Sequence, residues 1–175
     1  VRILQGAPKK ILMTKKILIT GGAGYIGSHI SEILIKDKKK VFIVDNLSTG
    51  YKKLVSKKVK FYKADIKDKK KINYIIKKNN IDTVVHLAAS LVISEGEKNP
   101  NLYYKNNVIG TKKLLEACQK TNIKNFIFSS TAAVYRESFK KVSEYSNIKP
   151  KSVYGKTKLR AEKLIIKYCK KKKIN

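Results

Sequence analysis

A glycine-rich turn between an apolar run and an amphipathic stretch constrains the fold of this chain more than any other feature. Residues 17–20 read Ile-Leu-Ile-Thr, and glycines follow at positions 21, 24 and 27. Gly21 permits a tight turn, Gly24 lets the main chain approach a pyrophosphate, and Gly27 lets a helix pack closely on the strand. The free N–H groups at the helix start also bind anions. The segment therefore predicts a strand, a phosphate-binding turn and a helix.

The order of apolar and amphipathic segments predicts the fold class. The predicted strands cover 17–20, 40–45, 59–63, 81–87 and 125–129, and the predicted helices cover 25–36, 68–79, 100–121 and 152–172. Strands that are apolar throughout and alternate with helices are typical of a parallel sheet covered on both faces. Right-handed crossovers make such a sheet doubly wound. We therefore predict a Rossmann-like α/β fold, a doubly wound parallel sheet with helices on both faces.

Helical spacing predicts which side chains of two helices face the core. In the helix at 25–36 the predicted inward side chains are Ile26, Ile30, Ile33 and Leu34. In the helix at 68–79 they are Ile72, Ile75 and Ile76. Asp68 stands where its carboxylate can cap the start of this second helix.

The length of 175 residues and a hydrophobic content of 42% suit one globular domain with a real core. We assign residues 13–175 to this domain, because Met13 stands just before the first strand. Residues 1–12 are interpreted as a leader or an artefact and are expected to be disordered. The chain has neither a bilayer-spanning apolar run nor the core of a signal peptide. Cys118 and Cys169 lie far apart, so we expect no metal site and a reduced, cytoplasmic protein.

The net charge of +29 raises the question of a nucleic-acid partner. Lysines are spread over every helix and loop, whereas the arginines number three, at positions 2, 136 and 160. Arginine is the preferred bidentate reader of phosphate and guanine. Composition drift in an AT-rich coding sequence explains this mixture, so we expect no specific nucleic-acid binding, with nonspecific attraction to polyanions at low salt. A basic binding module without chemistry remains the alternative.

Asp45 stands at the end of the second predicted strand. A carboxylate about 20 residues beyond the glycine turn meets the adenosine ribose in dinucleotide-binding domains. It accepts hydrogen bonds from a 2′-hydroxyl and repels a 2′-phosphate, which favours NAD over NADP. The alternative is an ordinary aspartate in a turn at the end of a strand.

Tyr154 and Lys158 form a second candidate constellation, because residues four apart lie on one helix face. A nearby ammonium favours the phenolate, so we expect Lys158 to lower the pKa of Tyr154 from its usual value of about 10. Such a tyrosine acts as a general base and then as an acid. The spacing is common in a lysine-rich helix, but here it follows a strand that ends at residues 128–131, Phe-Ser-Ser-Thr. Ligands of open α/β sheets bind at that edge.

Six motifs together resemble the extended short-chain dehydrogenase/reductase family, and within it the UDP-glucose 4-epimerases. They are residues 21–29 (GGAGYIGSH), 45–48 (DNLS), 86–89 (HLAA), 103–111 (YYKNNVIGT), 129–135 (SSTAAVY) and 154–158 (YGKTK). They follow the order of the family from about residue 14 to the end of the chain.

The resemblance implies a role for each matching residue. The implied catalytic residues are Thr131, Tyr154 and Lys158. The implied NAD contacts are Gly21, Gly24, Tyr25, Ile26, Gly27, Asp45, Asn46, Asp65, Ile66, Leu87, Ala88, Ala89, Asn106, Tyr154 and Lys158. The implied reaction is epimerisation at C4 of a nucleotide sugar through a 4-keto intermediate, with Tyr154 moving the proton of the 4-hydroxyl.

Local departures from the family pattern bear on the exact activity. Related 4,6-dehydratases carry an Asp-Glu pair after the catalytic threonine, whereas Ala132 and Ala133 stand here. Alanine supplies neither acid nor base, which favours epimerisation over dehydration. Leu91 replaces a lysine found in some epimerases, and Arg136 stands where glycine is usual. Another family activity on nucleotide sugars, such as that of a uronate epimerase, a dehydratase or a reductase, stays open.

Family members are roughly twice as long as this chain, which matches the size of two domains. We therefore expect an N-terminal fragment that ends before the substrate domain, binds NAD weakly and is inactive alone. The resemblance also implies a homodimer for the full-length form. His86 and His29 are expected to be structural rather than ligands.

Overall fold

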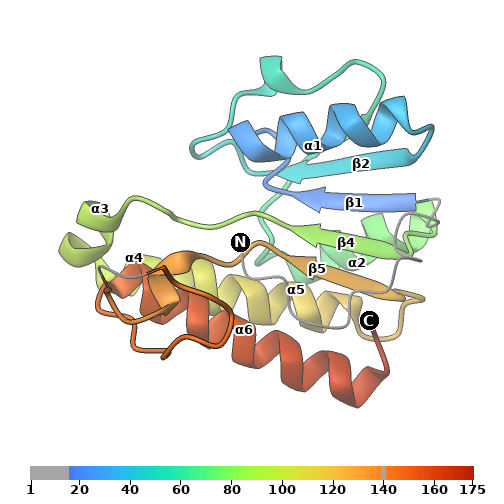
Figure 1. The fold of residues 1–175 in the computed structure, drawn as a ribbon. Coiled ribbons are helices and arrows are strands. Elements are labelled where there is room, and N and C mark those ends of the chain that lie inside the picture. Colours follow the sequence, from blue (N-terminus) through green and yellow to red (C-terminus); the bar gives the residue numbers. More distant parts are fainter. Residues whose placement is uncertain (1–15, 139–140) are drawn as a thin grey trace.

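The computed structural model describes residues 16–138 and 141–175. The expectation for residues 1–12 lies outside these described residues. Five parallel strands form one sheet in the order β3-β2-β1-β4-β5. Figure 1 shows β2, β1, β4 and β5 side by side. Their bounds are β1 Lys16–Thr20, β2 Lys40–Asp45, β3 Lys60–Lys63, β4 Thr83–His86 and β5 Asn125–Phe128. The order changes direction between β1 and β4, which opens a crevice at their carboxyl ends.

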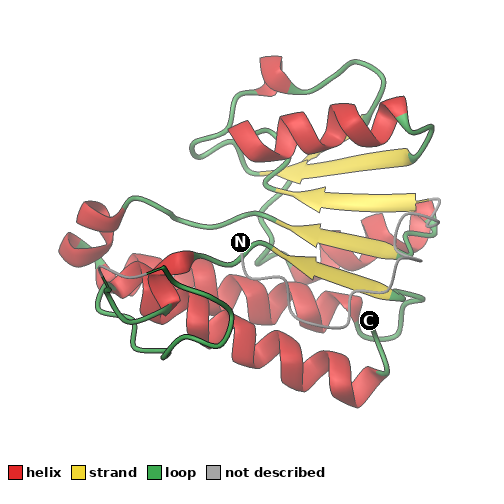
Figure 2. Ribbon diagram, viewed as in Figure 1, coloured by secondary structure: helices red, strands yellow, loops and turns green. Residues whose placement is uncertain are grey.

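Helices connect the strands and pack on the sheet (Figure 2). The helices are α1 Tyr25–Lys36, α2 Lys69–Asn79, α3 Ile93–Lys98, α4 Pro100–Tyr103, α5 Gly110–Cys118 and α6 Val153–Lys172. Two short 3₁₀ turns, η2 Lys52–Leu54 and η4 Ala132–Val134, and a π-helical segment, η3 Tyr104–Ile109, complete the elements. Three short elements, α3, η2 and η4, were not predicted from the sequence, because none is long enough to show a periodic pattern.

Alternate side chains of β1 enter two different cores, as expected for a sheet buried on both faces. Ile17 and Ile19 join the core beneath α1, together with Ile43 of β2. Leu18 joins the larger core formed with α2, α5 and α6. The predicted doubly wound α/β fold is confirmed.

The predicted inward face of α1 is partly wrong. Ile26 and Ile33 are 57% and 59% exposed, whereas Ile30 and Leu34 pack against the core. Gly27 explains the rotation: a Cβ there would lie 2.6 Å from the Gly22 Cα atom, so this side of the helix rests on the turn. In α2 the prediction is confirmed, since the isoleucines at 72, 75 and 76 are buried and the Asp68 carboxylate accepts from Lys71 N at 3.0 Å.

The helix predicted over 100–121 is continuous but irregular in its middle, and it ends before the predicted residue 121. It begins at Pro100, widens into the π segment η3 and ends at Cys118, where Gln119 takes an extended conformation. Asn106 and Asn107 both lie in this π segment. Widened turns of this kind are frequent at functional sites.

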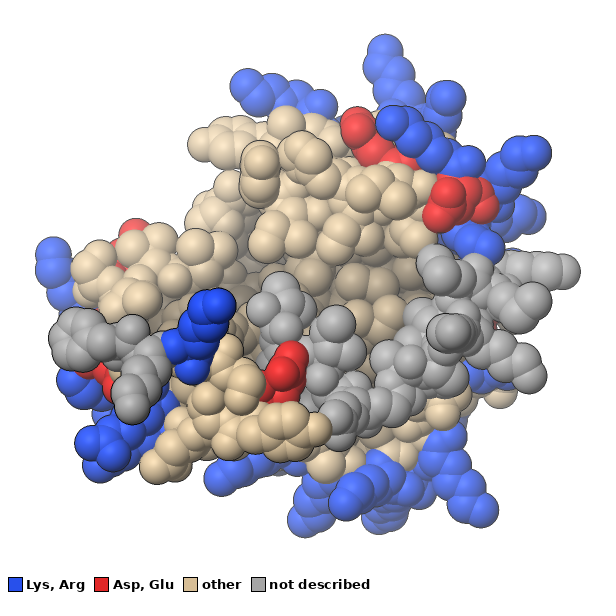
Figure 3. All heavy atoms as spheres, viewed as in Figure 1, with Lys and Arg blue, Asp and Glu red and all other residues tan. Residues whose placement is uncertain are grey.

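Basic side chains are spread over the surface, as they are along the sequence. Figure 3 shows lysine and arginine side chains around the outline of the visible face, with no continuous basic stripe across it. Within 16–138 and 141–175, no helix combines the length and apolarity needed to cross a membrane.

Candidate functional site

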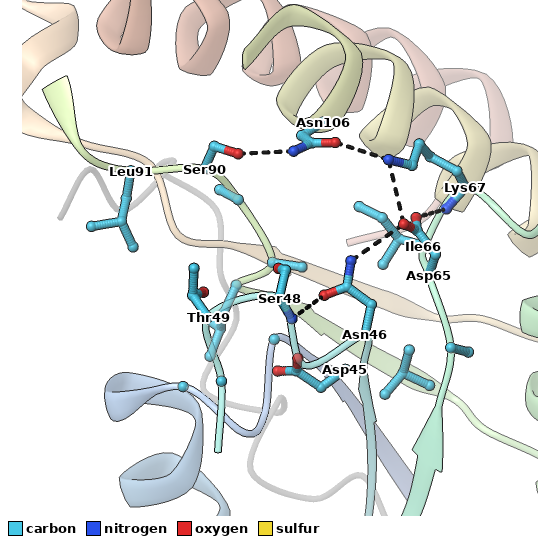
Figure 4. A pocket seen from close by; sticks show the side chains of 18 of the residues that line it. Asp45, Asn46, Ser48, Thr49, Asp65, Ile66, Lys67, Ser90, Leu91 and Asn106 are labelled. Atoms are coloured by element: carbon cyan, nitrogen blue, oxygen red, sulfur yellow. Dashed lines mark hydrogen bonds and ion pairs between the residues drawn. The ribbon is translucent and has the colours of Figure 1, made fainter. Parts of the chain in front are cut away.

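A cavity lies where the carboxyl ends of β1, β2, β3 and β4 meet the loops that follow them (Figure 4). Most of the predicted NAD contacts line it: Gly21, Gly24, Asp45, Asn46, Asp65, Ile66, Leu87, Ala88, Ala89 and Asn106. The other lining residues were not predicted as NAD contacts from the sequence; they are Val44, Ser48, Thr49, Gly50, Ala64, Lys67, Ser90, Leu91, Val92 and Glu95.

The glycine turn at one wall of this cavity fits a phosphate. Gly21 has a φ of +72°, and a Cβ there would lie 2.7 Å from Ala88 N, so the position demands glycine. At Gly24 a Cβ would have Gly21 O as its nearest neighbour, at 3.4 Å, an ordinary contact distance. α1 begins at this glycine without a side-chain cap, which leaves its first N–H groups for an anion. The geometry therefore fits the diphosphate of a dinucleotide.

Tyr25, Ile26 and Gly27 follow this glycine in the first turn of α1. The side chains of Tyr25 and Ile26 are 78% and 57% exposed and do not line the cavity. Gly27 is buried against the turn. The contacts predicted for these three residues are therefore expected from their backbone N–H groups.

Asp45 lies in the cavity wall and also braces the glycine turn. Its Oδ2 atom accepts from Ala23 N at 3.0 Å, and its Oδ1 atom accepts from Leu47 N at 2.8 Å. The alternative of an ordinary turn aspartate therefore describes part of its role. A carboxylate oxygen has a second lone pair, so these bonds leave acceptor capacity for a ribose hydroxyl.

A chain of polar side chains crosses one wall of the cavity (Figure 4). Asn106 donates to Ser90 Oγ at 2.9 Å and accepts from Lys67 Nζ at 2.8 Å. Lys67 also pairs with Asp65 at 3.3 Å, and Asp65 accepts from Asn46 Nδ2 at 3.3 Å. The chain thus joins three predicted contacts through Lys67, whose role no motif in the sequence indicates.

Asn107 fixes the opposite side of the same helical turn. Its side chain accepts from Ser90 N at 2.8 Å and donates to Ser90 O at 2.9 Å and to Thr157 Oγ1 at 3.1 Å. Thr157 in turn donates to the Tyr154 carbonyl at 2.8 Å. This buried residue therefore ties the loop after β4 to the first turn of α6.

His86 is a buried structural residue, as predicted. Its Nδ1 atom lies 2.7 Å from Thr20 Oγ1, and its Nε2 atom lies 2.9 Å from Thr111 Oγ1. The Thr111 hydroxyl donates its proton to Asn107 O at 2.7 Å, so the imidazole must donate from Nε2 and accept at Nδ1. Burial, helped by the Lys158 charge, lowers the pKa of His86 to about 3.

This pKa predicts acid sensitivity of the fold. The unfolded chain binds a proton at His86 near the usual pKa of about 6.5, and the folded chain only near 3, so stability falls as the pH drops through this window. We expect a loss of roughly 5 kcal/mol over the window, seen as a falling thermal midpoint between pH 6.5 and pH 4. His86→Gln should flatten this dependence, and His29→Gln at the exposed histidine of α1 is the matched control. An equally steep fall in His86→Gln would contradict the assignment.

Thr131 and Tyr154 meet at the carboxyl end of β5. Thr131 is the N-cap of η4, where its Oγ1 atom accepts from Ala133 N at 3.2 Å. Tyr154 lies in the first turn of α6, where the Thr131 side chain acts on its phenol and lowers its pKa against the effect of burial. Close packing brings the two elements together, because a Cβ at Gly155 would overlap the Ala133 carbonyl oxygen.

The expected effect of Lys158 on Tyr154 is wrong for this structure. Burial raises the pKa of Tyr154, and the opposing influence is the Thr131 side chain. The Lys158 ammonium donates instead to Ser129 O at 2.5 Å and lies 4.0 Å from the centre of the Phe128 ring. Burial lowers the pKa of Lys158 itself to about 8.

Comparison with known proteins identifies the family. Residues 17–175 match the NAD dependent epimerase/dehydratase family. The chain belongs to this family. A UDP-glucose 4-epimerase of Lactobacillus helveticus is 42% identical over 151 residues, which cover 86% of this chain and 46% of that protein. Family membership accounts for the glycine turn and for NAD as the cofactor.

Two solved structures of the family share the fold. The UDP-glucose 4-epimerase of Brucella ovis in complex with NAD has a TM-score of 0.88 and 36% identity, over 92% of this chain and 50% of that one. The Thermotoga maritima UDP-glucose 4-epimerase with UDP-glucose has a TM-score of 0.86 and 34% identity, over 91% and 52%. The chain spans about half the length of the relatives it matches.

Proposed function

We propose that this chain is the cofactor-binding part of an NAD-dependent nucleotide-sugar 4-epimerase. The observation that carries the proposal is that Tyr154 of α6 and Thr131 of η4 come together at the same sheet edge as the dinucleotide cavity. A proton-transfer group beside a cofactor site is what an oxidation and reduction at a sugar carbon requires. The relatives named as UDP-glucose 4-epimerases support C4 as that carbon.

The cofactor contacts follow from the cavity wall. The glycine turn and the start of α1 would hold the diphosphate, and Asp45 would hold the adenosine ribose. Asp65 and Ile66 would border the adenine. Lys158 lies outside this wall, and the family resemblance is what assigns it to the nicotinamide ribose. When bound, NAD supplies a reversible hydride acceptor for the sugar C4.

The residues that follow β5, together with Tyr154, would transfer the proton of the sugar 4-hydroxyl. Tyr154 takes the proton of the sugar 4-hydroxyl as C4 is oxidised, and it returns this proton after the 4-keto sugar has presented its other face. Thr131 hydrogen-bonds the substrate hydroxyl and favours the phenolate against the effect of burial. Ala132 and Ala133, on η4 beside Thr131, supply no acid or base for the elimination of water.

The compartment and the assembly belong to the same proposal. Cys118 and Cys169 are free thiols, which supports a reducing cytoplasm. A groove between α4 and α6 is lined by apolar and basic side chains that include Tyr104, Leu159 and Arg160. We assign this groove to the homodimer face of the full-length form.

The proposal is tested by binding and turnover measured together. We expect the 175-residue chain to bind NAD weakly in calorimetry and to show no turnover. We expect the product of the whole reading frame to interconvert UDP-glucose and UDP-galactose without net consumption of NAD. A stoichiometric requirement for NAD(P)H would instead indicate a reductase. Salt-sensitive nucleic-acid binding without NAD affinity would indicate a basic binding module.

A further inference from the structure

Glu162 is a buried acidic residue that the proposed mechanism does not use. It lies on α6, one turn beyond Lys158 and two turns beyond Tyr154, and it is 2% exposed. The Ser130 hydroxyl donates a hydrogen bond to its Oε1 atom. Burying a carboxylate is costly unless it is paired and hydrogen-bonded. A buried acid in this place therefore calls for an explanation.

Two consecutive residues after β5 are held by successive turns of α6. Lys158 donates to the Ser129 carbonyl at 2.5 Å, and Ser130 donates to Glu162. Thr131 follows directly, and its side chain is the one that lowers the pKa of the Tyr154 phenol. The position of Thr131 relative to Tyr154 thus depends on both hydrogen bonds, the one from Lys158 to Ser129 and the one from Ser130 to Glu162.

We propose that Glu162 is a positioning residue, which anchors Ser130 and balances the buried ammonium of Lys158, so that the proton-transfer residues are assembled before the cofactor binds. The reaction roles of those residues rest on the proposed function. The contacts of Glu162 stand on the structure alone.

The surroundings of Lys158 show what the Glu162 charge does. Burial disfavours the ammonium and lowers the pKa of Lys158, and Glu162 is the group that raises it again. The Phe128 ring of β5 adds a cation–π contact. His86 of β4 is neutral, and the Tyr154 phenol is neutral because burial raises its pKa. Glu162 is therefore the negative charge that keeps Lys158 cationic near pH 7.

The first test measures the titration of Lys158 in the cofactor-free 175-residue chain. NMR of isotopically labelled lysine side chains follows the ammonium, and Lys158→Arg assigns its resonance. Burial lowers the pKa of Lys158 to about 8, so its signal is expected to titrate below the usual range of a lysine. In Glu162→Gln, the proton concentration at its midpoint should rise about tenfold. The control is Glu116→Gln on α5, a partly exposed acid paired with Lys113, which should leave the midpoint unchanged.

The second test distinguishes positioning from a purely structural role. If Lys158 holds the cofactor as a cation, NAD affinity measured by calorimetry falls as the pH rises through the Lys158 midpoint. In Glu162→Gln this fall should move to lower pH by the same amount as the NMR midpoint. A purely structural residue would weaken binding equally at every pH and leave the profile in place.

The outcomes separate this inference from the proposed function. A folded Glu162→Gln chain with a wild-type Lys158 midpoint would overturn the role of Glu162. If that variant does not fold, Glu162→Asp keeps the charge and should keep the midpoint, and a tenfold shift there would overturn the role equally. A wild-type chain that binds no NAD at any pH would count against the proposed function, and the titration would still decide the case of Glu162.

Discussion

Replacing Tyr154 by phenylalanine is expected to lower the rate of UDP-sugar epimerisation by about 10²- to 10⁴-fold in the product of the whole reading frame. The substitution removes the phenolic oxygen and nothing else, so the general base is lost while the first turn of α6 keeps its packing. The carbonyl of residue 154, which accepts from Thr157, is also unchanged. The fall should appear in kcat, measured with saturating UDP-galactose.

Tyr74→Phe provides the matched control, because it makes the same chemical change on the exposed face of α2. It should leave the rate at the wild-type value. NAD affinity should differ little between the two variants, since the Tyr154 side chain does not line the dinucleotide cavity. Epimerisation by Tyr154→Phe within a factor of about ten of wild type would remove this tyrosine from the proton transfer.

Gly27→Ala should destabilise the fold and abolish measurable NAD binding by the 175-residue chain. A Cβ at Gly27 would overlap Gly21 O and lie 2.6 Å from Gly22 Cα, and both are backbone atoms that move only with the whole turn. Overpacking of this kind costs about 1–3 kcal/mol. The thermal midpoint should fall by roughly 2–4 °C for each kcal/mol lost.

Gly24→Ala is the informative partner of this variant. Its Cβ would meet Gly21 O at 3.4 Å, which the structure tolerates. Its thermal midpoint should therefore stay at the wild-type value, while NAD affinity falls because a methyl group enters the phosphate-binding wall. A wild-type midpoint and wild-type affinity for Gly27→Ala would show that α1 does not need close contact with the turn.

The sequence was sufficient for the fold and for most of the cavity wall, because these depend on local patterns. Apolar runs alternating with helices determine a parallel sheet, and the carboxyl ends of parallel strands share one edge. Asp45 at the end of β2 and Asp65 just after β3 are therefore brought together by topology alone. Asn106 joins them from a helix, and only the family resemblance assigns it to the same site.

Side-chain direction depended on packing that no local pattern records. Ile26 and Ile33 fit a helical stripe, yet the contact of Gly27 with the turn rotates them into solvent. Lys158 has the spacing of a partner for Tyr154, but its ammonium finds the Ser129 carbonyl and the Phe128 ring in a buried space. Both differences arise from neighbours distant in the sequence.

Glu162 was not predicted as a residue of the site, although its spacing in the sequence indicated it. Glu162 continues the i, i+4 series of Tyr154 and Lys158, and this spacing was sufficient to place all three on one helix face. Lys67 had no such spacing, because its link to Asn106 joins a loop after β3 to the π segment. One lysine among so many others forms no sequence motif that could be recognised.

The π-helical segment η3 determines how α4, which precedes it, is rotated about the helix axis relative to α5. Each residue of a helix turns the chain by about 100°. Loss of one residue from Tyr104–Ile109 would leave α5 in the core and swing α4 around its axis by that angle. The buried phenol of Tyr103 would then leave the Val92 carbonyl to which it donates at 2.5 Å, and the loop after β4 would lose its anchor. The extra residue therefore lets one continuous helix place Asn106 in the wall of the cofactor cavity and Asn107 in contact with α6.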